Sequence, residues 1–307
     1  MVAMLSSTRR LTGGPLRGDY RINEPLAGYT SWRVGGPADR LYLPADSEDL
    51  LVFLESLPVD EPLYWLGLGS NLLIRDGGIR GTVVCTKNRL KSMRHLGDGR
   101  VYAEAGVPSA LVAKFCAEHR LAGAEFLAGI PGTLGGALAM NAGAFGGETW
   151  PLIDSVVTVN RRGQLTRRRP DEFEVGYRSV KRAAEEWFLG AELKLNPGET
   201  EASREAMRSL LAARAEKQPT NQPSCGSVFR NPPGDYAARL IESCGLKGIF
   251  LGGAQVSEKH ANFIINTGRA SAADIESLIE HVRHQVSINH GIDLIPECHI
   301  VGEYLSS

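Results

Sequence analysis

The pattern of apolar and polar positions along this chain predicts a mixture of short strands and amphipathic helices. Runs rich in β-branched and aromatic residues, bounded by glycine, proline or asparagine, are typical of strands. Such runs occur at 62–66, 81–86, 100–106, 186–195, 262–268 and about 298–304. Segment 154–168 has the pattern of a hairpin that turns near Arg162 and Gly163.

Apolar spacing and end signals also predict helices at 108–123, 201–216, after Asp235 as far as Gly245, and 271–286. Pro108 suits the first turn of its helix, and Gly123 suits the end. Asp235 is expected to cap the third helix. Ser271 and Asp274 form a pattern like a capping box at the start of the fourth.

This order of strands and helices indicates an α+β or α/β protein. The sequence "NPGET" after the strand at 186–195 marks a domain boundary near 197. Prolines and a glycine then exclude long regular structure from 217–235, apart from one short strand. The chain has no repeat of 20–50 residues.

Composition narrows the function classes. A chain of 307 residues is long enough for two or three domains, and a net charge of −1 gives no electrostatic case for a nucleic-acid or membrane partner. No apolar run approaches the roughly 20 residues that a membrane span needs. The cysteines are scattered and odd in number, which favours a reducing cytoplasm over a disulfide framework or zinc site; they are Cys85, Cys116, Cys225, Cys244 and Cys298.

Several side chains that resemble ligands have a simpler interpretation. His281 and His284 lie opposite the apolar face of their helix, which favours a solvated surface over a metal site; that face comprises Ile275, Leu278, Ile279, Val282 and Val286. His119 is interpreted as a buried, hydrogen-bonded histidine. The arginines of "RRGQLTRRR" are interpreted as a solvated cluster rather than a phosphate site. No metal is expected.

Two glycine-rich segments, 67–74 and 129–147, require another explanation. Backbone without side chains can bring its N–H groups close to phosphate. Neither segment is a Walker A loop or a GxGxxG motif. Pro131, Thr133 and Asn141 also lie in the second segment. Two such loops suggest one extended ligand that crosses two subdomains, and a dinucleotide with a central pyrophosphate fits.

The motifs "TSWRVGGPAD", "LGLGSNLLI", "GIPGTLGGALAMNAGAFG", "GYRS", "PSCGSVFRNP", "SEKHANFIIN" and "LIPE" occur in this order. From about residue 20 onward, the chain resembles the UDP-N-acetylenolpyruvoylglucosamine reductase (MurB) family, and its shorter, type II branch. The resemblance implies an α+β fold: an FAD-binding fold of the p-cresol methylhydroxylase type in two subdomains, then an α+β substrate-binding domain. The implied domains are a flexible tail, 1–19; an FAD domain, 20–197, with subdomains 20–88 and 89–197; and a substrate domain, 198–307, whose last strand can pack back on the FAD domain.

The same resemblance implies a non-covalent FAD site in the two glycine segments. Its residues are Gly67, Gly69, Ser70, Asn71, Leu72, Pro131, Gly132, Gly135, Gly136, Asn141, Ala142 and Gly143. A Cβ at the closest positions is expected to collide with the pyrophosphate, whereas bare amides donate to its oxygens.

The family's reaction passes hydride from NADPH to FAD and then to an enolpyruvyl double bond in a UDP-sugar of cell-wall synthesis. The reaction needs a cation near an enolate-like charge and a proton donor. By motif, Ser227 matches the family's proton donor, and Arg178 and Glu297 match the two charged residues that act beside it. Which of the two performs which role stays open. Lys217, Asn231 and His260 match substrate contacts. The chain departs from the family's usual residues at three positions. Cys225 stands where alanine is usual, Arg230 where lysine is usual, and His299 where arginine is common.

A cytoplasmic monomer is expected. Two other classes remain: another flavoenzyme of the same fold, such as an alcohol oxidase, and a nucleotide-sugar binding protein without activity. Many such oxidases tether flavin through a histidine, and neither glycine segment contains one. The motifs around Arg178, Ser227 and Glu297 argue against the binding protein.

Overall fold

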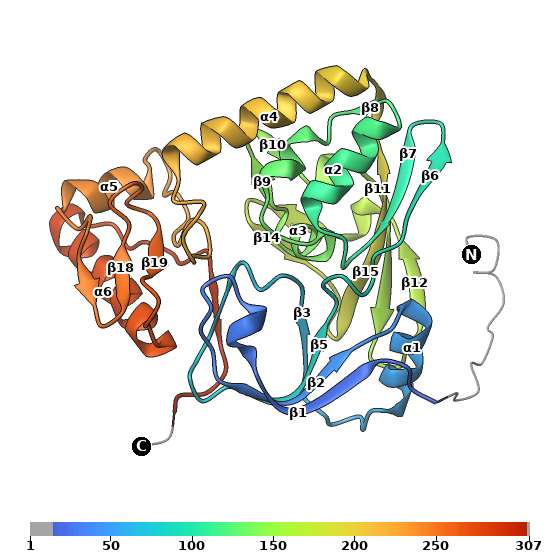
Figure 1. The fold of residues 1–307 in the computed structure, drawn as a ribbon, viewed down its shortest axis with the longest axis horizontal. Helices are drawn as coiled ribbons and strands as arrows, with labels where there is room; N and C mark the ends of the chain where they lie inside the picture. The colour runs from blue at the N-terminus through green and yellow to red at the C-terminus, as the bar shows by residue number, and fades with distance from the viewer. Residues whose placement is uncertain (1–14, 306–307) are drawn as a thin grey trace.

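Three larger sheets organise the structure, a computed structural model that describes residues 15–305. The expected tail, 1–19, lies mostly outside these residues. Each sheet carries its own helices, and Figure 1 shows the three resulting units side by side, with α4 (Thr200–Lys217) running from the second unit to the third. We refer to them as the first, second and third units.

The first unit is a four-stranded sheet with the strand order β1-β2-β5-β3. Its strands are β1 (Asp19–Pro25), β2 (Pro37–Leu43), β3 (Leu63–Leu66) and β5 (Ile79–Cys85). Helix α1 (Ser47–Ser56) begins where Asp46 accepts the Asp49 N–H, and it buries Leu50 and Phe53 against this sheet. The predicted strands at 62–66 and 81–86 are confirmed to within two residues.

The second unit is a five-stranded sheet with the order β12-β11-β15-β7-β6, and α2 (Ser109–Glu118) and α3 (Leu134–Met140) belong to it. The large strands are β6 (Met93–Gly97), β7 (Arg100–Glu104), β11 (Ile153–Asn160), β12 (Leu165–Arg168) and β15 (Glu186–Lys194). The short ones are β8 (Leu121–Ala122), β9 (Gly143–Ala144), β10 (Gly147–Glu148), β13 (Glu174–Gly176), β14 (Ser179–Lys181) and β16 (Asn196–Pro197). The predicted hairpin is confirmed as the antiparallel pair β11–β12.

The predicted cluster of arginines is at the surface, and two of its members also form ion pairs with buried acids. Arg167 Nη2 lies 2.6 Å from Glu192, and Arg168 Nε lies 2.9 Å from Glu186. Both glutamates are buried on β15, where a carboxylate needs a charged or donating partner. These two arginines therefore neutralise buried acids of the sheet.

Helix α2 ends at Glu118, before the expected Gly123. His119 Nδ1 lies 2.8 Å from the Phe115 carbonyl, and Arg120 takes a left-handed φ of 56°. The chain then enters β8, which pairs with β16 and excludes a further turn of helix. His119 is hydrogen-bonded as expected, although its side chain is half-buried.

The third unit is a three-stranded sheet, β17 (Phe250–Leu251), β18 (Ala254–Val256) and β19 (Ile264–Asn266), with α5 (Ala237–Ser243) and α6 (Ala272–His290). The predicted capping box of Ser271 and Asp274 is confirmed. So is the buried apolar face of α6. His281 and His284 lie off that face, and residues 15–305 hold no cluster of three or more potential metal ligands.

Helix α5 is capped differently from the prediction. Asp235 pairs with Arg239, whose Nε lies 2.7 Å from its Oδ1. Asn231 Oδ1 accepts the Ala237 N–H instead, at 3.1 Å. The tight turn at 232–235 brings Asn231 to the helix start, a placement that sequence spacing does not reveal.

Two of the contacts that join the first unit to the third help to position the site. Trp32 is fully buried in the third unit's core, and its Nε1 donates to the Ile264 carbonyl at 2.7 Å. Strand β20 (His299–Val301) pairs in parallel with β4 (Leu72–Ile74), the strand after the first glycine segment. The chain therefore returns to the first glycine segment through its last described strand.

Candidate active site

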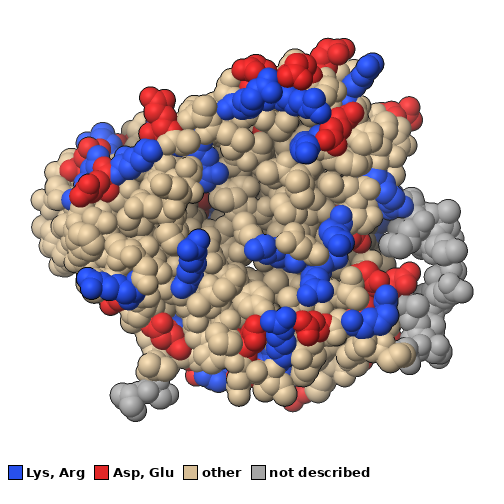
Figure 2. All heavy atoms as spheres, viewed as in Figure 1, with Lys and Arg blue, Asp and Glu red and all other residues tan. Residues whose placement is uncertain are grey.

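A cavity of about 1060 Å³ lies where the three units meet. Its wall combines the glycine segments with several residues from each of the segments 177–182, 225–231 and 297–301. Four Lys or Arg side chains line it against one carboxylate, that of Glu297; they are Arg178, Lys181, Arg182 and Arg214. Basic side chains gather near the hollow in Figure 2, whereas acidic ones lie mostly along the outer edges. The cavity therefore suits an anionic ligand.

The first glycine segment follows β3 and bends sharply at Gly69, whose φ is +66°. A Cβ on Gly69 would lie 2.1 Å from the Tyr29 carbonyl oxygen, so the protein itself requires glycine here. The amides of Gly69, Ser70 and Asn71 donate no hydrogen bond within residues 15–305. They are available to an oxygen-rich ligand in the cavity.

The second segment contains glycines of two kinds. A Cβ on Gly135 would lie 2.8 Å from Ala105 Cβ, and one on Gly143 would lie 2.5 Å from the Gly147 carbonyl. By contrast, a Cβ on Gly132 or Gly136 would meet no protein atom closer than 3.5 Å, and both positions line the cavity. Among the glycines of this segment that line the cavity, only these two keep open a space that no protein atom fills. This cradle fits a dinucleotide such as FAD.

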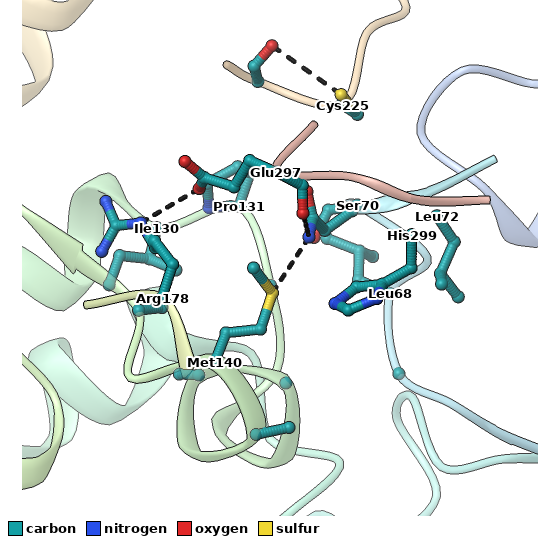
Figure 3. Close-up of a pocket in the computed structure, with 18 of the residues that line it drawn as sticks. Leu68, Ser70, Leu72, Ile130, Pro131, Met140, Arg178, Cys225, Glu297 and His299 are labelled. Atoms are coloured by element: carbon teal, nitrogen blue, oxygen red, sulfur yellow. Dashed lines mark hydrogen bonds and ion pairs between the residues drawn. The ribbon is translucent and has the colours of Figure 1, made fainter. Parts of the chain in front are cut away.

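Arg178 and Glu297 form an ion pair in the cavity wall, directly next to the two glycine segments, with Nε and Oε1 3.0 Å apart (Figure 3). Both side chains are less than a fifth exposed. Burial raises the pKa of Glu297 above its ordinary value, although Arg178 and Arg230 act in the opposite direction. A partly desolvated carboxyl beside a fixed cation is typical of sites that move protons.

Ser227 lies beside this pair because two strand-like segments are held together. Glu297 N–H donates to the Val228 carbonyl at 2.7 Å, and Phe229 bridges to Pro296. Asn71 Nδ2 donates to the Glu297 carbonyl at 2.9 Å. Ser227 lines the cavity, and its hydroxyl makes no hydrogen bond within residues 15–305. It is therefore free to act on a ligand.

The structure brings most predicted site residues to this cavity. The lining includes all three predicted catalytic residues and Asn231, as well as Gly67, Gly69, Ser70, Asn71, Leu72, Pro131, Gly132, Gly135, Gly136, Ala142 and Gly143. Cys225 and His299 line it too, and burial lowers the pKa of His299. Figure 3 shows His299 beside Leu68 and Leu72.

Three predicted residues lie outside this lining. Lys217 is exposed at the end of α4. His260 Nδ1 accepts the Asn262 N–H at 3.3 Å, and its ring packs edge-on against Phe263. The side chain of Asn141 turns away from the cavity towards Glu148 and Trp150. Arg230 also lies outside, and its Nη2 donates to the Arg178 carbonyl at 3.3 Å.

Sequence reasoning missed part of the wall. Leu68, Ile130 and Met140 lie among the glycines and present apolar side chains. Arg182 and Arg214 bring positive charge from segments with no motif. The sequence did contain a signal for the three apolar residues, since an apolar side chain inside a ligand-binding glycine segment must pack against the ligand or against the protein. The two arginines gave none.

The raised pKa of Glu297 predicts a pH-dependent stability. A native pKa above the unfolded value means that the folded protein binds more protons, so the free energy of unfolding falls as pH rises through the native pKa. Glu297→Gln cannot ionise. The melting temperature of this variant, relative to the unsubstituted protein, should therefore rise as pH is increased from about 4.

Thermal unfolding of the two proteins across a pH series tests this expectation. Glu258→Gln, at an exposed position, is the control and should show no such trend. A relative melting temperature that falls with pH would mean that the attraction of Arg178 outweighs burial.

Comparisons with known proteins agree with this geometry. Residues 38–168 match an FAD binding domain, and residues 218–301 match the UDP-N-acetylenolpyruvoylglucosamine reductase C-terminal domain. The chain is 65% identical to the UDP-N-acetylenolpyruvoylglucosamine reductase of Methylococcus capsulatus, over 95% of this chain and 96% of that protein. It is 59% identical to that of Alkalilimnicola ehrlichii, over 98% and 99%.

The crystal structure of UDP-N-acetylenolpyruvylglucosamine reductase from Thermus caldophilus matches with a TM-score of 0.78 at 31% identity, over 92% of this chain and 98% of that one. The predicted α+β fold, an FAD-binding part followed by a substrate-domain-like part, is confirmed. No helix within residues 15–305 has both the length and the apolar character for crossing a bilayer. On the identity and coverage of these relatives, this chain belongs to the UDP-N-acetylenolpyruvoylglucosamine reductase family, oxidoreductases with an FAD-binding domain.

Proposed function

We propose that this chain uses NADPH to reduce the enolpyruvyl double bond of UDP-N-acetylglucosamine enolpyruvate, giving UDP-N-acetylmuramate for peptidoglycan in the cytoplasm. The observation that carries the proposal is the Arg178–Glu297 pair beside Ser227, in the same cavity as the two glycine segments and hydrogen-bonded to both. Such a wall offers a cation, a carboxyl group and a hydroxyl to a ligand in one cavity.

FAD is proposed to lie along the glycine segments without a covalent bond. The free amides of Gly69, Ser70 and Asn71 would donate to its pyrophosphate, and Gly132 and Gly136 leave room for it. When bound, FAD supplies the hydride that it has received from NADPH. Asn141 and Leu72 are then proposed to support the FAD site by shaping the backbone of the two segments. The Asn141 side chain itself points towards Glu148.

The chain's own residues handle charge and proton. Arg178 places a permanent cation where negative charge develops on the substrate carboxylate and the adjacent carbon. Glu297 accepts from Arg178 Nε and so holds the guanidinium in the wall. Ser227 is proposed to give its hydroxyl proton to that carbon, since the hydroxyl has no competing protein partner.

The substrate is proposed to enter between the second and third units. Asn231 lines that part of the cavity, and Lys217 and His260 lie outside its wall. We propose that Lys217 contacts the UDP group after moving from its exposed position, and that His260 acts through the adjacent Asn262. The proposed domain bounds are 20–197 and 198–307, and a monomer is proposed.

An anaerobic NADPH titration tests the function. Purified protein should be yellow, should lose flavin absorbance with NADPH and should recover it with the enolpyruvyl substrate. A colourless protein would favour a binding protein without activity. A yellow protein that reacts with an alcohol but not with the enolpyruvyl sugar would favour an oxidase of the same fold.

Denaturation should release all of the flavin, because the proposed contacts are hydrogen bonds and packing. After acid or heat precipitation, flavin absorbance is measured in the supernatant and in the redissolved pellet. His299 is the histidine in the cavity wall, so His299→Gln serves as the control for a tether. If flavin stays with the pellet of the native protein but is released from His299→Gln, flavin is covalently bound at His299.

A further inference from the structure

Arg178 lies in the turn of an exposed hairpin. Strands β13 and β14 have three residues each. They pair antiparallel, with Glu174 opposite Lys181 and Gly176 opposite Ser179. Five of these six residues are exposed, and a hairpin of this size is at best marginally stable by itself. The position of the Arg178 guanidinium therefore depends on what holds the turn from outside.

Asn141 holds this turn from the buried side. The residue is 2% exposed, and its Nδ2 donates to the Gly176 carbonyl at 3.3 Å and to Glu148 Oε2 at 3.0 Å. Oδ1 accepts the Trp150 N–H at 3.2 Å. One amide thus joins the hairpin turn to two points on the segment 147–150.

The same residue also contacts the guanidinium. Arg178 Nη1 donates to the Asn141 carbonyl at 3.4 Å, and Nη2 donates to the Gly143 carbonyl at 2.9 Å. Nε faces Glu297. Asn141 therefore holds the turn with its side chain and receives the guanidinium with its backbone.

The chemistry of this position selects asparagine. Asn141 has φ 45° and ψ 53°, a left-handed conformation that Asn and Gly tolerate better than other residues. Its side chain must also donate twice and accept once. An aspartate would meet two acceptors, the Gly176 carbonyl and the Glu148 carboxylate, without a proton to offer.

We propose that Asn141 is a positioning residue for Arg178, a role that rests on the proposed function of Arg178 in the reaction. The amide fixes the turn, the turn fixes the guanidinium, and the guanidinium meets the substrate. This role differs from the cofactor contact that the motif implied, and it makes Glu148 the partner that keeps the amide oriented.

Three variants separate the bonds of the amide. Asn141→Gly keeps the left-handed backbone and the carbonyl, and removes only the side chain. Asn141→Asp replaces the donor by an acceptor. Asn141→Asp combined with Glu148→Gln restores a donor between 141 and 148, but leaves the Gly176 carbonyl without one.

The FAD-loaded enzyme is then assayed for kcat, KM and hydrogen exchange at 174–181. Asn141→Gly should lower kcat about 10-fold or more, because a catalytic group displaced by about 1 Å loses much of its effect. KM should change much less, and the hairpin amides should exchange faster. In the double variant the melting temperature should return towards the native value while kcat stays low.

An Arg178→Lys background gives the readout that a purely structural role would not move. If Asn141 acts through Arg178, adding Asn141→Gly to this variant should lower kcat no further. Additive losses, native exchange rates in the hairpin of Asn141→Gly, or a double variant that recovers kcat along with stability would each overturn the inference.

The failure of the two proposals can be told apart. A native kcat in Asn141→Gly together with a strong loss in Arg178→Lys overturns the inference and leaves the proposed function intact. A native kcat in Arg178→Lys removes the proposed role of Arg178, and the inference falls with it.

Discussion

Ser227→Ala should lose flavin absorbance with NADPH at close to the native rate, but should recover it with the enolpyruvyl substrate at least ~10²-fold more slowly. That factor is the lower end of what a positioned general acid contributes. Ser227 is proposed to act only when the substrate carbon needs a proton, so the step with NADPH does not require it. Substrate affinity should change little, because a single hydroxyl is lost among many contacts.

Anaerobic stopped flow separates the two steps. Ser224→Ala, three residues away and outside the cavity lining, is the matched control and should behave like the native protein. Ser227→Cys should retain part of the second step, since a thiol also carries a proton. If Ser227→Ala instead loses absorbance slowly and recovers it normally, Ser227 belongs to the NADPH step, and Glu297 becomes the first candidate for the proton donor.

Gly136→Val should yield folded protein that binds FAD roughly 10- to 100-fold more weakly, because an extra side chain in a filled site costs about 1–3 kcal/mol. A Cβ here meets no protein atom closer than 3.8 Å and the position lines the cavity, so a larger side chain can extend into the open cavity of the apoprotein. Glycine is also the poorest helix former after proline, and Gly136 lies in α3. The apoprotein of this variant should therefore be no less stable than the native one.

Two other glycines provide the controls for this experiment. Gly135→Val should destabilise the apoprotein itself, since its Cβ would lie 2.8 Å from Ala105 Cβ. Gly28→Val lies away from the cavity with no atom within 4 Å of the added Cβ, so flavin binding should be native. Flavin titration and apoprotein melting are measured for each variant. Native flavin affinity in Gly136→Val would show that the open space at this position is not used by the cofactor.

The sequence predicted elements whose determinants are local. Helix α6 has its capping box and its apolar face within one segment, so spacing alone places both. The β11–β12 hairpin is similarly local. The end of α2 was misplaced because the pairing of β8 with β16, more than seventy residues later, stops the helix.

For the candidate site, the sequence predicted only the residues that belong to recognisable motifs. They indicated the glycine segments and the group of Arg178, Ser227 and Glu297, which the fold assembles from distant segments. They did not distinguish Gly135, which packs against Ala105, from Gly136, which faces open space. Nor did they reveal the direction of the Asn141 side chain, which depends on a left-handed backbone at one residue.

The pairing of β20 with β4 has a consequence for how the protein is made. Asn71 and Glu297, which share a hydrogen bond in the cavity wall, are 226 residues apart in the chain. A nascent chain on the ribosome displays the glycine segments long before the segment around Glu297 exists, and Trp32 must wait for the core that buries it. We expect flavin capture to follow synthesis of the third unit, so that cofactor loading draws on nearly complete chains rather than on translating ones.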